Sequence, residues 1–363
     1  MKIGMIGFTA RGTALCRRLA DYFTEDGDEC IAFVPERFLD AGDGDGIMRS
    51  RDVSLEGWTG SMFEDGRAMI FVGAAGIAVR AVAPFVRDKM TDPPVVVVDE
   101  AGQFSIPILS GHVGGANELA VRIAGCLGAV PVITTATDVN GLFAVDVFAA
   151  ENGLLLTDRQ EAKYISACLL EGKRVGFFND FSGQAAPRGC VGEVCGHNIW
   201  ITVRKPDYIA LPGCGEPGAF LPGAPCTLRL VPKAVVAGVG CRRGTDVRCL
   251  ERRIMEALKE HGIDPAAVKA LATIDVKKDE QAIHALAARY GWELRFYSAK
   301  RLLEAEGTFE ESEFVKQTVG VGNVCERACL AKGGRLLFGK QAGDGVTVAA
   351  AVEGIKLNIE KYI

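Results

Sequence analysis

The sequence lacks the features that would place it in several large protein classes. Its 12 cysteines in 363 residues are far below the roughly 8–10% of a disulfide-stapled scaffold. The first residues show no charged stretch followed by an apolar core, so we expect no signal peptide. The longest apolar stretch, residues 68–86, is interrupted by Arg80, Pro84 and two glycines, which favours strand, turn and helix over a membrane span. These absences predict a cytoplasmic protein with reduced thiols and no membrane partner.

Sequence patterns of common nucleotide, nucleophile and zinc sites are also missing. The segment Gly238–Thr245 (GVGCRRGT) has neither the Gly-Lys-Ser/Thr ending of a phosphate-binding loop nor GxGxxG spacing. The chain contains no GxSxG elbow and no CxxC pair. Its net charge of −5 argues against a surface built for nucleic acid. We therefore expect no nucleic-acid partner, no nucleotide cofactor and no metal-ligating residues.

Glycine is the residue present in excess, with 44 copies in 363 residues against about 7% in average proteins. Val- and Ile-rich runs alternate with segments of helical periodicity, and many glycines fall between them. This alternation predicts α/β layers with a mostly parallel sheet. In the N-terminal region we predict strands at 2–8, 30–34, 68–72, 95–98, 104–109 and 130–134.

The alternation weakens in the middle of the chain and then returns. Residues 183–225 crowd Gly, Pro and Cys together with few periodic runs, whereas strand and helix patterns resume at Lys233. We predict an N-terminal α/β domain over 1–139 and a C-terminal α/β domain over 233–363. A smaller, irregular middle domain or linker over 140–232 joins them.

The loop Ser110–Glu118 (SGHVGGANE) is the sharpest local feature, and it lies between a predicted strand and a predicted helix. His112 can act as an acid or base near neutral pH, Asn117 is a candidate ligand contact, and Glu118 is either a carboxylate partner or a helix-dipole residue. Glycine backbones can approach a ligand closely, and free N–H groups at a helix start attract anions. The glycines are Gly111, Gly114 and Gly115. The alternative is a tight turn with a capping histidine.

Three further polar turns follow predicted strands of the N-terminal region. The segment Thr134–Asp138 (TTATD) offers hydroxyls, Thr135 among them, and a carboxylate that suit an oxyanion or a carboxylate ligand. The turn before Arg80 is flanked by glycines, and Arg80 supplies positive charge. Asp99 comes directly after the buried run 95–98, where α/β sites form. An ordinary turn is the alternative for the threonine segment, and a solvated helix face is the alternative for Arg80.

The C-terminal region repeats this theme in Gly238–Thr245. Two arginines beside a helix start suit carboxylate or phosphate groups. A second polar cluster around Lys277 follows an apolar run, and a capped loop is its alternative. The candidate ligand contacts are Gly240, Arg242, Arg243, Gly244, Thr245 and Lys277. In the middle region, Cys190, Cys195, His197, Cys214 and Cys226 gather without zinc-type spacing.

Taken together, the motifs closely resemble the cobalt-precorrin-5A hydrolase family of anaerobic cobalamin biosynthesis. The resemblance covers essentially the whole chain. It is carried by GAAGIAVR (73–80), VVVVDE (95–100), SGHVGGANE (110–118), VITTATD (132–138), GVGCRRGT (238–245) and ATIDVKKDE (272–280).

The resemblance implies an enzyme that opens the lactone of cobalt-precorrin-5A with water and releases acetaldehyde, giving cobalt-precorrin-5B. The corrinoid substrate is fringed with carboxylates and carries its own cobalt, so no separate cofactor is expected. Contacts with neighbouring pathway enzymes and the oligomeric state stay open. A corrinoid carrier without chemistry and an ordinary nucleotide-binding α/β enzyme are the alternatives.

From the residues we then expect His112 as general base and Glu118 or Asp138 as the group that orients it or returns a proton. Backbone N–H groups of Gly114 and Gly115, with Thr134 or Thr135, are expected to stabilise the oxyanion. Arg80, Arg242 and Arg243 are expected to bind substrate carboxylates.

Overall fold

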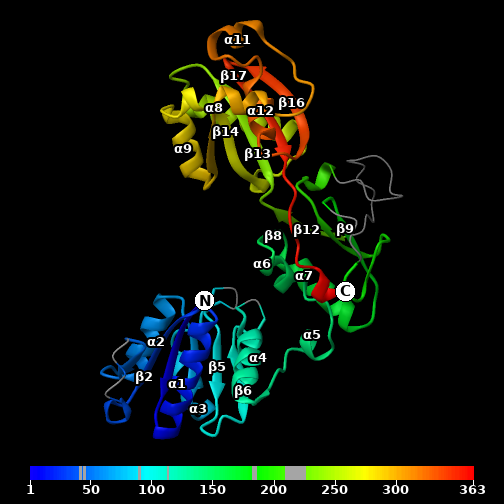
Figure 1. Ribbon diagram of the computed structural model, residues 1–363. Helices are drawn as coiled ribbons and strands as arrows, with labels where there is room; N and C mark the ends of the chain where they lie inside the picture. The colour runs from blue at the N-terminus through cyan, green and yellow to red at the C-terminus, as the bar shows by residue number, and fades with distance from the viewer. Residues whose placement is uncertain (41–42, 44–45, 89–90, 113, 182–185, 209–225) are drawn as a thin grey trace. The chain divides into compact units, whose positions relative to one another are not determined.

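The computed structural model describes the chain except for residues 41–42, 44–45, 89–90, 113, 182–185 and 209–225 (Figure 1). Contacts divide it into two compact units, Met1–Gly141 and Leu142–Ile363. Each unit is described by itself. No helix of the described residues is long and apolar enough to cross a membrane.

The first unit holds a seven-stranded sheet in the order β3-β2-β1-β4-β5-β6-β7. Its strands are β1 (Lys2–Gly7), β2 (Glu29–Val34), β3 (Met48–Ser50), β4 (Ala68–Val72), β5 (Val95–Val98), β6 (Phe104–Leu109) and β7 (Val130–Pro131). Its helices are α1 (Ala10–Glu25), α2 (Leu55–Glu64), α3 (Ala75–Val82), α4 (Ala116–Leu127) and α5 (Ala136–Val139), with a 3-10 turn η1 (Glu36–Phe38).

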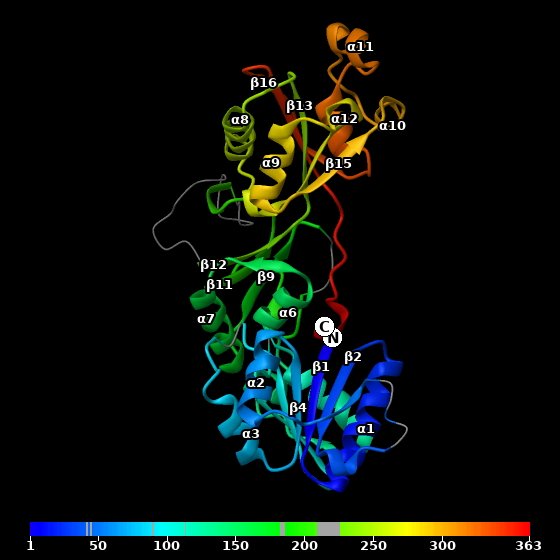
Figure 2. The same cartoon turned by 90° about the vertical axis from the view of Figure 1, so that its left-hand side faces the viewer.

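Helices cover both faces of this sheet, which explains the uninterrupted valines of β5. The inward stripes of α1 and α4 pack on one face, and those of α2 and α3 pack on the other (Figure 2). A strand buried on both faces needs apolar side chains at every position. Helix α1 is capped by Thr9, whose Oγ1 accepts a hydrogen bond of 3.0 Å from Gly12 N–H.

One strand pair departs from the parallel pattern, since β6 runs antiparallel to β5. The connection between them is too short for a crossover helix, so the chain must turn back as a hairpin. Asp99 Oδ1 accepts hydrogen bonds from Gln103 N–H at 2.7 Å and Phe104 N–H at 2.6 Å, which close that turn. Asp99, a site candidate from the sequence, therefore has a local structural role.

The reversal separates two of the glycine-rich turns. The turn after β4 lies at the carboxyl edge of the parallel strands. The loop after β6 lies at their amino edge, because Leu109 pairs with Val95 and Ser110 Oγ donates to the Asp92 carbonyl oxygen at 2.8 Å. The two loops are thus separated by the length of the strands.

The second unit holds two five-stranded sheets. The middle sheet has the order β10-β9-β11-β12-β8, and the C-terminal sheet has the order β15-β14-β13-β17-β16. The middle elements are α6 (Val145–Glu151), β8 (Leu154–Leu156), α7 (Arg159–Leu170), β9 (Val175–Asn179), β10 (Cys190–Val191), β11 (His197–Ile201), η2 (Pro206–Tyr208) and β12 (Cys226–Pro232). They form a regular, mostly parallel sheet, although β11 falls where the sequence shows few periodic runs.

The C-terminal sheet follows directly. Its elements are β13 (Val235–Cys241), α8 (Val247–Glu260), η3 (Pro265–Ala267), β14 (Val268–Ile274), η4 (Asp275–Lys277), α9 (Gln281–Tyr290), β15 (Glu293–Tyr297), α10 (Ala299–Leu303), α11 (Glu313–Val319), α12 (Val324–Leu330), β16 (Arg335–Gly343), β17 (Val346–Val352) and η5 (Glu360–Tyr362). Helices α8 and α9 cover one face, and α10 and α12 cover the other (Figure 2).

The α/β class predicted from the sequence is confirmed, with mostly parallel sheets in the N- and C-terminal regions. The chain end makes an unexpected return to the middle sheet. Ile359 is fully buried in the middle core, and Tyr362 Oη donates to Glu151 Oε2 at 2.7 Å. The boundaries of the three predicted domains stay a prediction.

Candidate functional site

A cavity of about 1110 Å³ lies at the carboxyl ends of β13 and β14 in the C-terminal sheet. These strands are parallel neighbours, with Gly238 beside Ala272, so their ends open at one edge. Ligands of open α/β sheets bind at this edge. The loop Gly240–Asp246, the turn around Lys277 and the helices α11 and α12 contribute to the wall.

The cavity wall carries both signs of charge with an excess of cations. The cationic side chains are those of Arg242, Arg243, Lys277 and Lys340. The carboxylates are those of Asp246, Asp279 and Glu280. Lys277 is partly neutralised, because its Nζ lies 3.6 Å from Glu280 Oε2, whereas Arg242 and Arg243 are exposed.

The turn between β13 and α8 is held by its own hydrogen bonds. Thr245 Oγ1 donates to the Arg242 carbonyl oxygen at 2.7 Å, and Gly244 N–H donates to Glu280 Oε1 at 3.0 Å. Asp246 caps α8 by accepting from Arg248 N–H at 2.9 Å. The helix start is thus capped by a carboxylate of the chain itself, so positive charge for a ligand comes from the arginine side chains.

One buried hydroxyl in the cavity wall has no partner among the described residues. Thr273 is only 1% exposed, and its Oγ1 makes no hydrogen bond. A buried polar group without a partner costs about 1–3 kcal/mol. Thr273 also lines the cavity, so this hydroxyl lies close to the ligand space, although the atom itself is buried from solvent.

Behind the cavity, a buried carboxylate connects two wall residues. Glu326 accepts hydrogen bonds from Asn323 Nδ2 at 2.7 Å and from Lys340 N–H at 2.6 Å. Asn323 in turn caps α12 by accepting from Glu326 N–H at 3.1 Å. Beside them in the wall, burial raises the pKa of the Cys241 thiol above its usual value, so this thiol stays protonated at neutral pH.

The structure gathers all six predicted residues of the C-terminal region into the cavity wall: Gly240, Arg242, Arg243, Gly244, Thr245 and Lys277. Sequence reasoning placed Thr273 in the polar cluster around Lys277 without assigning it a ligand contact, and it missed Asn323 and Thr347 as wall residues. They lie on other elements, and only the sheet topology brings them to one edge. Gly240 is also a packing residue, because a Cβ there would lie 2.6 Å from Thr347 Oγ1.

In the N-terminal unit, the His112 loop and the threonine segment lie together. Asn117 Nδ2 donates to Thr135 Oγ1 at 2.9 Å. The loop closes on itself through Asn117 N–H to the Gly111 carbonyl oxygen at 2.9 Å. His112 is partly buried and Thr134 is exposed. The predicted strand 130–134 ends at Pro131, which leaves both threonines in the following turn.

The other candidates of this unit are distributed as follows. Gly111 and Gly114 pack against loop side chains, and Gly115 takes φ 86° before α4, a conformation that favours glycine. Glu118 is exposed, and the side chain of Asp138 lies outside the described part of the structure. Arg80 is not brought to the His112 loop, since its Nη1 lies 3.5 Å from the Gly76 carbonyl oxygen at the opposite sheet edge.

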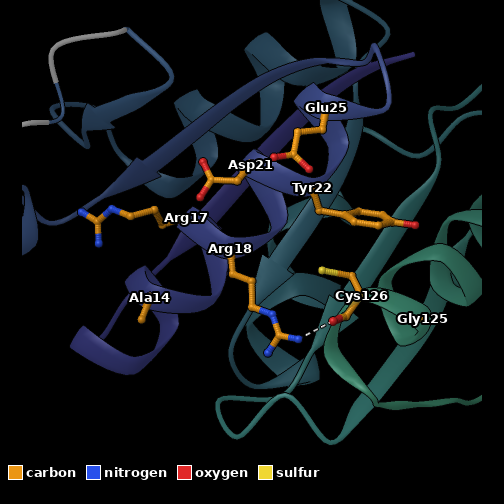
Figure 3. A pocket seen from close by; sticks show the side chains of 8 residues that line it. All are labelled: Ala14, Arg17, Arg18, Asp21, Tyr22, Glu25, Gly125 and Cys126. Atoms are coloured by element: carbon orange, nitrogen blue, oxygen red, sulfur yellow. Dashed lines mark hydrogen bonds between the residues drawn. The ribbon is translucent and has the colours of Figure 1, made fainter.

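A second hollow of about 630 Å³ lies between α1 and the end of α4 (Figure 3). Arg18 Nη2 donates to the Cys126 carbonyl oxygen at 2.5 Å, and Arg17 is paired with Asp40 and Asp43. The remaining charged lining groups are the carboxylates of Asp21 and Glu25. Because its cations are already bonded, this hollow is a weaker candidate for an anionic ligand.

Comparison with known proteins supports one family over the whole chain. Residues 57–138 match the family model for the cobalamin synthesis G N-terminal region, 143–207 its central region and 235–351 its C-terminus. The chain is 37% identical over 358 residues to cobalt-precorrin-5A hydrolase of Salmonella typhimurium, covering 96% of this chain and 97% of that protein.

Two further relatives match different shares of the chain. Cobalt-precorrin-5A hydrolase of Priestia megaterium is 28% identical over 370 residues, covering 96% of this chain and 94% of that protein. Protein CobE of Sinorhizobium sp is 32% identical over 132 residues, covering 36% of this chain and 86% of that protein.

Proposed function

The chain belongs to the cobalt-precorrin-5A hydrolase family, and from this premise we propose that it binds its corrinoid substrate in the C-terminal cavity. In the proposed reaction, water opens the lactone of cobalt-precorrin-5A. The freed hydroxyl then loses its proton while a carbon–carbon bond breaks. The electron pair of that bond passes into the conjugated macrocycle, and the two-carbon fragment leaves as acetaldehyde. The product is cobalt-precorrin-5B. A cytoplasmic location goes with this proposal, and the cobalt is part of the substrate.

The observation that carries the binding proposal is the cavity at the β13–β14 edge with its unpartnered Thr273 hydroxyl. Corrinoid acetate and propionate groups are carboxylates, which the exposed guanidinium groups of Arg242 and Arg243 can bind through paired N–H donors. Lys340 adds a further positive charge. These contacts hold the substrate by its peripheral carboxylate groups.

For the chemical step we propose His112 as general base, with the Gly114 N–H group and Thr134 or Thr135 stabilising the oxyanion. The Gly115 N–H, expected from the sequence to join them, already donates to the His112 carbonyl oxygen at 3.1 Å. Two facts support this choice: His112 is partly buried, and the Asn117–Thr135 hydrogen bond keeps the threonine segment beside its loop. Glu118 and Asp138 stay candidates for orienting His112. This proposal is tested separately from the binding proposal.

Purified protein and cobalt-precorrin-5A, assayed for acetaldehyde, test the activity. Arg242→Ala with Arg243→Ala is expected to raise KM at least about tenfold, since charge-assisted hydrogen bonds are worth about 1.5–3 kcal/mol each. Arg248→Ala, an exposed arginine on α8 outside the cavity wall, is the matched control. An unchanged KM in the double variant would remove the cavity from substrate binding.

The general-base proposal predicts a different kinetic change. His112→Ala is expected to lower kcat about 10²-fold or more with little change in KM. Near-normal turnover would exclude His112 as the base. A protein that binds the corrinoid and releases no acetaldehyde would instead be a carrier of the intermediate.

A further inference from the structure

A second cluster of ligating side chains lies on the middle sheet, away from the residues that line the C-terminal cavity. Glu161 is on α7, His197 begins β11 and Cys226 begins β12. Glu161 Oε1 lies 2.7 Å from His197 Nδ1. One ligand atom from each of the three residues lies within 4.8 Å of the other two.

The fold explains how residues far apart in sequence meet here. Strands β11 and β12 are parallel neighbours, and His197 is the direct partner of Cys226 in their ladder. Directly paired residues project to the same face of a sheet. Helix α7 packs against both strands (Figure 2). From this helix the Glu161 carboxylate reaches the His197 ring.

A buried side chain fixes the backbone beside both strand residues. Asn198 is fully buried, and its Oδ1 accepts from Cys195 N–H at 2.9 Å. Its Nδ2 donates to the Cys195 carbonyl oxygen at 2.9 Å and to the Cys226 carbonyl oxygen at 3.2 Å. This arrangement holds His197 and Cys226 in register, so both ligand side chains keep their positions on the sheet.

We propose that Glu161, His197 and Cys226 form a binding site for a divalent transition-metal ion, with Zn²⁺ and Co²⁺ as the fitting class. Imidazole, thiolate and carboxylate are the ligands these ions take in proteins. A carboxylate, a thiolate and a neutral imidazole together balance the charge of the ion. Cys226 is exposed, which leaves room for water at the fourth position.

Binding requires a small rearrangement. Bonds of about 2.0–2.3 Å in tetrahedral geometry place ligand atoms about 3.3–3.8 Å apart. The 2.7 Å contact between Glu161 and His197 must therefore open. His197 binds the ion through Nδ1 as a neutral imidazole, with its one ring proton on Nε2. The Cys226 thiol loses its proton to solvent on binding, so metal uptake releases protons.

Titration of the full chain with Zn²⁺ against a chromogenic chelator tests the site. We expect one equivalent to bind at neutral pH. Cys226→Ser, His197→Ala and Glu161→Gln are each expected to weaken binding at least about tenfold. Cys195→Ser is the matched control, because the Cys195 thiol points to the Glu193 carbonyl oxygen at 3.6 Å and is outside the cluster.

Two readouts keep the outcome independent of folding and of catalysis. Co²⁺ is expected to give a sulfur-to-cobalt charge-transfer band that Cys226→Ser abolishes and Cys195→Ser keeps. Zn²⁺, but not Mg²⁺, is expected to slow alkylation of Cys226 in the unchanged chain. Binding that survives Cys226→Ser, or alkylation that Zn²⁺ does not slow, would overturn the proposal.

Discussion

Glu326 accepts a 2.6 Å hydrogen bond from the backbone N–H of Lys340, which ties helix α12 to β16 beside the cavity. The other carboxylate oxygen accepts from Asn323 Nδ2 at 2.7 Å. Glu326 is only 5% exposed, so water does not compete for these bonds. One buried side chain therefore positions two residues of the cavity wall.

Replacement of Glu326 by glutamine is expected to lower the free energy of unfolding by about 1–3 kcal/mol. Glutamine offers one acceptor oxygen where two donors converge, so either the Lys340 N–H or the Asn323 amide loses its partner. Urea unfolding measures the change. Glu304→Gln, whose side chain is 48% exposed and pairs with Arg301, is expected to change stability by less than about 0.5 kcal/mol.

Glu326→Gln is also expected to raise KM for the corrinoid several-fold while kcat changes less. Glu326 does not line the cavity itself, but it positions residues of the cavity wall. Stability equal to that of the unchanged chain would contradict the positioning role.

Thr273→Val is expected to separate ligand binding from stability. The Thr273 hydroxyl has no partner in the described structure, so its removal keeps or raises the free energy of unfolding, by up to about 1 kcal/mol. If a substrate group completes this bond, the dissociation constant rises about five- to tenfold. Equilibrium binding of cobalt-precorrin-5A and urea unfolding measure the two effects.

Thr245→Val provides the opposite case. The Thr245 hydroxyl donates to the Arg242 carbonyl oxygen at 2.7 Å, so its loss is expected to cost about 0.5–1.5 kcal/mol of stability. For Thr273→Val, a lower free energy of unfolding with unchanged substrate binding would show that the Thr273 hydroxyl is structural. It would contradict the proposal that this hydroxyl binds the substrate.

Most helices and strands of this fold can be predicted from the sequence. The direction of each strand and the contacts between distant elements cannot. The buried valines of β5 predict that strand with the observed bounds, residues 95–98. The direction of β6 depends on Asp99, whose carboxylate bonds the N–H groups of Gln103 and Phe104. That turn reverses the strand and moves the His112 loop to the other sheet edge.

Only part of the cavity wall can be predicted from the sequence. The loop Gly240–Thr245 is recognisable because its glycines and arginines are consecutive. Thr273, Asn323 and Thr347 join it only through the pairing of β13 with β14 and β17 and through the packing of α12. The middle sheet is not predicted from the sequence for another reason. Its strand β11 is short and lacks a clear alternation of apolar and polar residues.

Two glycine-to-alanine changes are expected to have opposite signs. A Cβ on Gly238 would overlap the Cys325 carbonyl oxygen, so α12 would have to move away from β13. The cost is expected to be about 1–3 kcal/mol. Gly125 lies in α4 with nothing near its Cβ position, so alanine there is expected to stabilise by about 0.5–1 kcal/mol.

Chemical unfolding followed by circular dichroism gives both signs. If Gly238→Ala is neutral, the close approach of α12 to β13 does not restrain this position. If Gly125→Ala instead lowers the free energy of unfolding, the alanine methyl group must clash with atoms that cover this side of α4 in solution.

A buried thiol predicts how stability responds to alkaline pH. Burial raises the pKa of the Cys16 thiol to about 12, whereas an unfolded cysteine titrates near about 8.5. Above pH 8.5 the unfolded chain loses this proton and the folded chain keeps it, so the free energy of unfolding falls as pH rises. At pH 9.5 the loss from this one thiol is about 1.4 kcal/mol. Cys16→Ala removes the group, so its loss of stability between pH 7.5 and 9.5 is expected to be smaller than that of the unchanged chain by about this amount. Urea midpoints at the two pH values measure the difference, and equal losses in both proteins would show that Cys16 is not buried as a neutral thiol.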